Sequence, residues 1–186
     1  QSRKLVNQAV QPVQVEPKDA DAVLVMNTNS WPRTNLVTLD ARWTQKGGQL
    51  LNAAGQVVPS QVLSSGELAF LAADVPPLGG VKYVPGKGEA VLPKNAVSVK
   101  DNRIENGLVS VEIDPASGAI SKLQLAGSDV NFVNRGNGPG LNDYLYVAGR
   151  KPDTPQRNGA PRISVKESGP LVASLLVESD APGCNI

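Results

Sequence analysis

The sequence predicts an all-β protein made of two successive β units. Pro occurs 15 times and Gly 18 times in 186 residues, and together they divide the chain into short segments. The segments between them either alternate polar and apolar residues or are continuously apolar. Helical periodicity is nearly absent. Short strands joined by tight turns are therefore the favoured structure.

The first unit is expected to be a small β-sandwich over residues 21–98, preceded by an extended linker over residues 1–20. Residues 22–27 are almost continuously apolar, which is typical of a central strand. Residues 35–43 alternate, and this predicts a strand that presents Trp43 on its apolar face together with Val37 and Leu39. Further strands are expected at 56–58, 67–75 and 81–84, with a rigid turn at 76–80.

The second unit is expected over residues 99–186. Asn106-Gly107 lies between alternating segments and predicts a tight hairpin. Asp114 opens a five-residue hairpin loop, where we expect its side chain to form an Asx turn with Ser117 and Gly118. Strands should follow at 119–125, 144–147, 163–166 and 171–178. No later strand completes the sheet, so we expect a larger sandwich that is cut short. Its open edges around residues 171–178 could pair with another chain.

The composition excludes several classes of partner. Lys and Arg number 18 against 17 Asp and Glu, for a net charge of +1, and the charges are scattered. Such a chain has neither the basic footprint of a nucleic-acid-binding protein nor a polybasic patch for an anionic membrane. No apolar stretch approaches the roughly 18 residues that span a bilayer. We therefore expect no nucleic-acid partner and no membrane partner.

The chain also lacks the residue types on which most catalytic chemistry depends. It has no His and a single Cys, Cys184. Zinc sites draw mainly on His and Cys, and Ser-His and Cys-His nucleophile systems need an imidazole base. A pair of carboxylates could still catalyse hydrolysis, but the sequence pattern does not indicate which two Asp or Glu residues would form such a pair. We expect no catalytic residue, no metal ligand and no cofactor in this chain.

Several segments resemble a known enzyme family. Residues 25–34, Val-Met-Asn-Thr-Asn-Ser-Trp-Pro-Arg-Thr, resemble the segment that opens the β-sandwich part of family 38 glycoside hydrolases, the α-mannosidases. The match continues in order, and Thr28 departs from it, standing where many members have Pro or Leu. The further matching segments are Val57–Gln61, Leu68–Phe70, Val75–Gly79, Tyr83, Ile104–Leu108 and Ile113–Leu123.

This resemblance implies a fold, a parent activity and a set of missing parts. The second unit would be the opening of a large sandwich similar to galactose mutarotase. The parent would hydrolyse α-mannosidic bonds in glycans with retention, using zinc and an Asp nucleophile in an N-terminal catalytic domain followed by a helical bundle. The start at Gln1, without Met, and the abrupt end suggest a segment of such a protein. Its partners would be those missing domains, and alone it should be inactive.

One substrate-contact residue follows from the resemblance. In family 38 a Tyr from the sandwich reaches the edge of the sugar site, and Tyr144 matches it by position. We expect Tyr144 to be exposed, with Leu145 or Tyr146 buried. Asn142 and Asp143 are weaker polar candidates. The alternative is that Tyr144 and Tyr146 share one face of a structural strand.

Other residues have plainer interpretations. Trp31 could stack on a sugar, but capping of the first sandwich is favoured because aromatic residues usually serve burial. Arg33 could bridge a domain junction, although a local surface role is favoured. Cys184 should be a small buried hydrophobe in the intact protein.

Two rival functions remain open. An independent carbohydrate-binding module would expose aromatic platforms, and the aromatic content of 4% argues against it. A structural adhesion-type sandwich would share the strands but not the ordered family segments. The Gly-, Asn- and Pro-rich, nearly Cys-free composition is compatible with a secreted or periplasmic bacterial protein.

Overall fold

The computed structural model describes residues 21–133, 138–150 and 154–184, and the chain divides into two compact units between Val91 and Leu92. The linker expected over residues 1–20 lies outside the described part. Within it, almost every regular element is a β-strand, and all strand pairs are antiparallel, which confirms the all-β prediction. Among the described residues, no helix has the length and apolar character needed to cross a bilayer.

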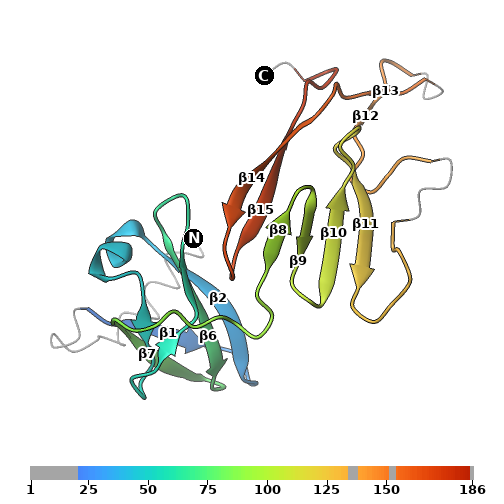
Figure 1. Cartoon of the computed structure of the whole chain (residues 1–186). Coiled ribbons are helices and arrows are strands. Elements are labelled where there is room, and N and C mark those ends of the chain that lie inside the picture. Colours follow the sequence, from blue (N-terminus) through green and yellow to red (C-terminus); the bar gives the residue numbers. More distant parts are fainter. Residues whose placement is uncertain (1–20, 134–137, 151–153, 185–186) are drawn as a thin grey trace. The chain divides into compact units, whose positions relative to one another are not determined.

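The first unit holds two sheets (Figure 1). One has the strand order β2-β6-β5 and the other the order β1-β7-β3-β4. The long strands agree with the sequence prediction, because the apolar runs at 22–27, 67–75 and 81–84 all form strands. Their bounds are β1 Val23–Asn27, β2 Arg33–Leu39, β3 Leu50–Leu51, β4 Val57–Val58, β5 Ser60–Val62, β6 Leu68–Val75 and β7 Gly79–Pro85.

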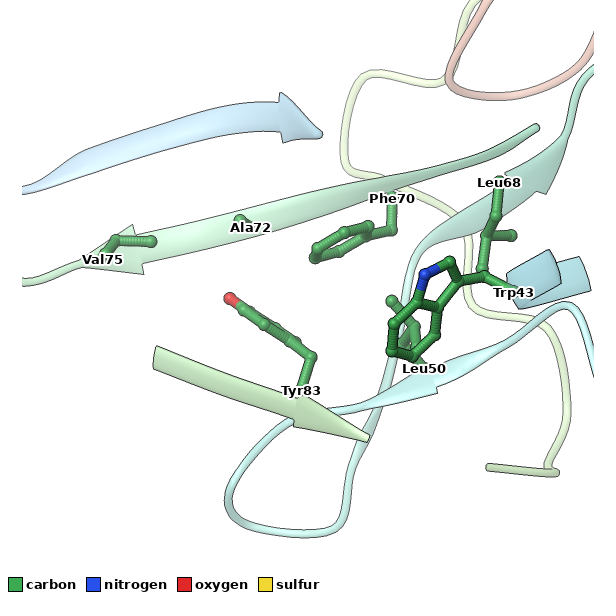
Figure 2. Packing of buried hydrophobic residues seen from close by; sticks show 7 residues of the cluster. All are labelled: Trp43, Leu50, Leu68, Phe70, Ala72, Val75 and Tyr83. Atoms are coloured by element: carbon green, nitrogen blue, oxygen red, sulfur yellow. The ribbon is translucent and has the colours of Figure 1, made fainter. Parts of the chain in front are cut away.

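A single apolar core joins the two sheets of the first unit (Figure 2). Phe70 from β6 and Tyr83 from β7 meet edge to face, with ring centroids 4.9 Å apart, so each sheet contributes one ring to the contact. Aromatic pairs prefer this geometry because the positive ring edge meets the negative ring face. The buried members of the core are Trp43, Leu50, Leu68, Phe70, Ala72, Val75 and Tyr83.

The segment around Trp43 is not the strand that its alternation predicted. Strand β2 ends at Leu39, and a 3₁₀ helix follows over Ala41–Lys46. Asp40 caps this helix because its carboxylate accepts a hydrogen bond from the Arg42 backbone amide. Trp43 is nevertheless buried in the core, as predicted, and the Lys46 ammonium lies 5.1 Å from the centre of its ring.

Trp31 does not cap the first unit, and the expectation that it would be buried is wrong. Its side chain is 59% exposed. Asn27 is buried instead and organises this end of β1. Its Nδ2 donates to the carbonyls of Trp31, at 2.7 Å, and Val75, at 3.1 Å. These bonds fix the Trp31 backbone, so the loop is ordered without burial of the indole.

The second unit is centred on a four-stranded sheet with the order β11-β10-β9-β8. The Asn106-Gly107 hairpin is confirmed: the Asn106 side chain accepts from the amides of Leu108 and Val109, and Gly107 has a φ of 75°. The Asx turn at Asp114 is also confirmed, since its carboxylate accepts from the Ala116 amide and the Ser117 hydroxyl. The strands are β8 Ser98–Lys100, β9 Arg103–Glu105, β10 Val109–Ile113 and β11 Ile120–Leu125.

Two smaller pairs complete the described part of the second unit. Strand β12 (Leu145–Tyr146) pairs with β13 (Gln156–Arg157), and β14 (Arg162–Ser168) pairs with β15 (Ala173–Glu178). The expected strands at 163–166 and 171–178 are thus present. In the described residues, each of these strands pairs with a single neighbour. Self-association through such open edges remains a prediction.

Burial differs sharply between the two units. In the four-stranded sheet of the second unit, one cross-strand row is apolar, and every member of it is only half-buried. Among the described residues of this unit, Ala119 and Val133 are the buried apolar side chains. The second unit therefore lacks a core comparable to that of the first. The apolar row consists of Val99, Ile104, Val111 and Leu123.

Tyr83 should make the stability of the first unit pH-dependent in the alkaline range. Burial raises the pKa of Tyr83 above its ordinary value of 10.0, whereas in the unfolded chain its phenol titrates near that value. The native state therefore holds the proton more tightly, and this contribution to stability is complete below about pH 10 and lost as the pH rises through the native-state pKa.

Urea unfolding followed by tryptophan fluorescence reports on this unit, because both tryptophans, Trp31 and Trp43, lie in it. The free energy of unfolding should fall more steeply above about pH 10 in the natural chain than in Tyr83→Phe. Tyr144→Phe, in the other unit, serves as the control and should retain the natural slope. Equal slopes for the natural chain and Tyr83→Phe would contradict the assignment.

Candidate functional site

The segment that leads to Tyr144 is fixed at both of its ends. The Leu141 carbonyl accepts a hydrogen bond from the Ile120 amide, at 2.9 Å, which attaches the segment to the edge of β11. Asn142 follows with a φ of 60°, in the left-handed region that Asn tolerates better than most residues. The chain then enters β12, where Leu145 pairs with Arg157. Tyr144 therefore sits at the start of a short strand in a defined position.

Asp143 is the most deeply buried charged side chain near this position. Only 2% of its side chain is exposed, and its Oδ2 accepts from the Gly140 amide, at 3.1 Å, and from the Arg157 guanidinium, at 2.6 Å. Its Oδ1 is also buried and has no hydrogen-bond partner in the described structure. A buried carboxylate is stable only when it is paired and hydrogen-bonded. The Asp143–Arg157 pair thus anchors the Tyr144 segment to β13.

Tyr144 itself is half-buried, and its hydroxyl is engaged within the chain. It donates a hydrogen bond to the Pro182 carbonyl, at 2.6 Å, and lies 3.6 Å from Cys184 Sγ. The hydrogen bond with the Cys184 thiol, reinforced by partial desolvation, raises the pKa of the Tyr144 phenol. At neutral pH the group is therefore a neutral phenol, able to donate one hydrogen bond and to accept others.

The expected exposure pattern around Tyr144 is wrong. We expected an exposed Tyr144 beside a buried Leu145 or Tyr146, but Leu145 is exposed and both tyrosines are half-buried. The physical reason is the turn over residues 181–184, which packs against both rings. Gly183, with a φ of 77°, lies so close to Tyr146 that a Cβ atom would stand 2.2 Å from the ring. No motif marked this long-range contact in the sequence.

Two other candidate residues have simple surroundings. The Arg33 guanidinium is exposed and lies beside the Asn35 side-chain amide, which fits a local surface role. Cys184 is an exposed free cysteine in this structure, and its burial in the intact protein stays a prediction.

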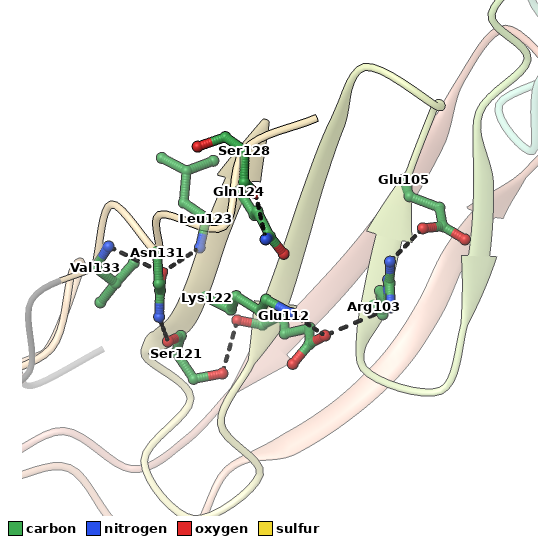
Figure 3. A network of polar contacts seen from close by, with 10 residues as sticks. All are labelled: Arg103, Glu105, Glu112, Ser121, Lys122, Leu123, Gln124, Ser128, Asn131 and Val133. Carbon is green, nitrogen blue, oxygen red and sulfur yellow. Dashed lines mark hydrogen bonds and ion pairs between the residues drawn. The ribbon is translucent and has the colours of Figure 1, made fainter. Parts of the chain in front are cut away.

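A polar network covers one face of the four-stranded sheet (Figure 3). Arg103 lies between Glu105, at 2.5 Å, and Glu112, at 3.7 Å, and Lys122 stands 3.9 Å from Glu112. Strand β10 alternates, with Val109, Val111 and Ile113 on one face. The same alternation places Ser110 and Glu112 together on the opposite face. That signal could have identified the polar face from sequence.

Within residues 21–133, 138–150 and 154–184, no three side chains of His, Cys, Asp or Glu are grouped so that they could hold a metal ion. The most defined chemical feature near the proposed substrate-contact position is the neutral phenol of Tyr144, supported by the Asp143–Arg157 pair. In comparisons with known proteins, no family model, no curated protein and no solved structure matches this chain.

Proposed function

We propose that the chain is a non-catalytic β part of a glycoside hydrolase that resembles the family 38 α-mannosidases. In this proposal the first unit is a small β-sandwich, and the second is the opening of a larger, mutarotase-like sandwich. The chain braces a catalytic domain and lines part of one wall of its glycan site. The parent protein hydrolyses α-mannosidic bonds with zinc that other domains hold, and this chain alone is inactive.

The observation that carries the proposal is the order and spacing of the family-like segments. The first group runs from Val25–Thr34 to Tyr83, and the second from Ile104–Leu108 to Ile113–Leu123. The two groups fall in different structural units, on either side of Val91. A chance likeness in one unit would not be expected to continue, in order, into the next.

The weak burial in the second unit is consistent with a role inside a larger protein. Its sheet has a half-buried apolar row, and Val130, Phe132 and Val165 are all exposed. Apolar surface left in water forfeits about 25 cal/mol for each Å² that burial would remove. Additional chain packed over this unit would recover that stabilisation.

The proposal is tested in the full-length protein that contains this chain, assayed on an aryl α-mannoside. We expect zinc-dependent turnover by the full-length protein and none by the chain alone. Tyr144→Phe should lower kcat/KM by roughly two- to tenfold, because one neutral hydrogen bond contributes about 0.5–1.5 kcal/mol. Tyr146→Phe is the matched control and should retain the natural kcat/KM.

Because the Tyr144 hydroxyl also bonds to Pro182, the melting temperature must be measured alongside the kinetics. A lower melting temperature with unchanged kcat/KM would show that Tyr144 only fastens the turn over residues 181–184. The proposal as a whole would be contradicted if the folded full-length protein did not hydrolyse the aryl α-mannoside. Zinc-dependent turnover by the purified chain would contradict it as well.

A further inference from the structure

The polar face of the second unit contains a cleft at one end of its sheet. The cleft has a volume of about 360 Å³. This lies within the roughly 300–1,000 Å³ that small-molecule sites occupy. It lies where the β9–β10 hairpin meets the turn that follows β11, and the Ala126 amide donates to the Leu108 carbonyl across this junction, at 2.8 Å. The two loops that frame the cleft are thus held together by the backbone.

Two glycines keep the rim of the cleft open. Gly107 and Gly127 both have a φ of 75°, and a Cβ atom at either position would meet nothing within 4 Å. Their left-handed conformation is one that glycine adopts without strain. The bends that frame the cleft therefore carry no side chains at these two points.

The floor of the cleft is a row of polar side chains that crosses three strands. Ser110 on β10 pairs in register with Glu105 on β9 and with Gln124 on β11. The Gln124 side-chain amide is held by the Ser128 carbonyl, at 2.6 Å. An acid, a hydroxyl and an amide thus stand side by side across neighbouring strands.

Ser110 is the unusual member of this row. It is 91% buried, with 9% of its surface exposed, and its Oγ has no hydrogen-bond partner in the described structure. Buried hydroxyls are normally paired, and leaving one unpaired is costly. A hydroxyl group of a ligand in the cleft is the kind of partner that this oxygen lacks.

The charges in the cleft select the class of ligand. Arg103 is paired with Glu105, and Asp129 adds a second carboxylate, so one guanidinium stands against two acids. This balance disfavours an anion such as phosphate. Because Arg103 already neutralises Glu105, the site also lacks the several free carboxylates that a divalent cation needs. Anions and divalent metal ions are thus both disfavoured, and a neutral ligand with several hydroxyl groups fits the polar side chains of the floor.

The rim supplies an apolar surface beside this polar floor. Leu108 is 51% exposed and Leu125 is 47% exposed, and both line the cleft. A pyranose ring has C–H faces that suit such leucines and hydroxyls that suit carboxylate, amide and serine partners. We propose that the cleft binds one neutral pyranose unit of a glycan. Tyr144 does not line this cleft, so the site is additional to the one in the proposed function and does not rest on it.

The test is a titration of the whole chain with methyl α-mannopyranoside and methyl α-glucopyranoside, followed through the backbone amide signals. We expect saturable shifts confined to residues 103–110 and 124–129 with at least one of these sugars. Gln124→Ala and Ser110→Ala should each weaken binding roughly fivefold, since each removes one hydrogen-bonding group. Ser110→Ala should leave the chain at least as stable as before, because it removes an unpaired buried hydroxyl.

Glu112→Gln is the matched control for Glu105→Gln. Both acids contact Arg103 on the same face of the sheet, but Glu105 lines the cleft and Glu112 does not. Only Glu105→Gln should weaken sugar binding. The absence of saturable shifts at these residues, equal affinity in the Gln124 and Ser110 variants, or shifts produced by inorganic phosphate or Ca²⁺ instead of sugar would overturn the proposal. These outcomes are independent of the mannosidase assay.

Discussion

Phe70→Ala should destabilise the first unit by about 3–5 kcal/mol, the usual cost of removing a buried aromatic ring. Phe70 is fully buried, and its ring packs against Tyr83 across the two sheets. Alanine would leave a cavity at the centre of a small core and remove the edge-to-face contact. Since small domains are stable by only about 5–15 kcal/mol, much of the unit could unfold. Urea unfolding followed by the fluorescence of Trp43 measures the loss.

Two further variants keep this result interpretable. Phe70→Leu retains most of the apolar volume and should cost much less, so it gives a measurable transition if the alanine variant does not fold. Leu78→Ala is the exposed control, because Leu78 is 77% exposed, and it should change stability by no more than about 0.5 kcal/mol. A loss below about 1 kcal/mol for Phe70→Ala would contradict the described core.

Arg157→Ala should destabilise the second unit by about 2–3 kcal/mol. The substitution leaves the Asp143 carboxylate buried, and of the two donors to Oδ2 described above only the Gly140 amide remains once the guanidinium is gone. Breaking a fully buried ion pair costs about 3–5 kcal/mol, and the value here is lower because half of the Arg157 side chain is exposed. Amide hydrogen exchange in β12 and β13 reports this loss locally.

The physical reason can be separated from a simple loss of side-chain packing. Asp143→Asn combined with Arg157→Ala removes the buried carboxylate charge that has lost its guanidinium partner. The double variant should therefore recover part of the stability that Arg157→Ala loses. Arg162→Ala replaces an exposed arginine of the same unit and should change exchange in β12 and β13 very little. If the double variant is no more stable than Arg157→Ala, the buried charge is not the cause.

Local patterns in the sequence were enough to predict most of the strands and turns. The run at 67–75 forms β6, Asn106-Gly107 forms a hairpin, and Asp114 forms an Asx turn. These features depend on residues within a few positions of one another, so a short stretch of sequence is enough to predict them. Alternation failed at Trp43, where the Asp40 cap stopped the strand, because a 3₁₀ helix can also bury one residue in a short segment.

The surroundings of the two candidate sites depend on distant residues. The Tyr144 hydroxyl bonds to Pro182, and Gly183 packs on Tyr146, so a turn 38 residues later in the chain sets the exposure of the predicted contact residue. The row formed by Glu105, Ser110 and Gln124 likewise arises from strand register across β9, β10 and β11. The register of each pair depends on its connecting turn and on the apolar patterns of both strands together, so it is settled only when the strands pair.

The sequence by itself thus determined the all-β class, the main turns and the burial of Trp43. It also excluded His-dependent chemistry, because the chain contains no His. Only the tertiary structure decided that Trp31 is exposed, that Asp143 is buried against Arg157, and that a polar row lines a cleft in the second unit. The reason is physical: backbone propensity and periodicity act within a segment, whereas burial and hydrogen-bond partners depend on which segments meet after folding.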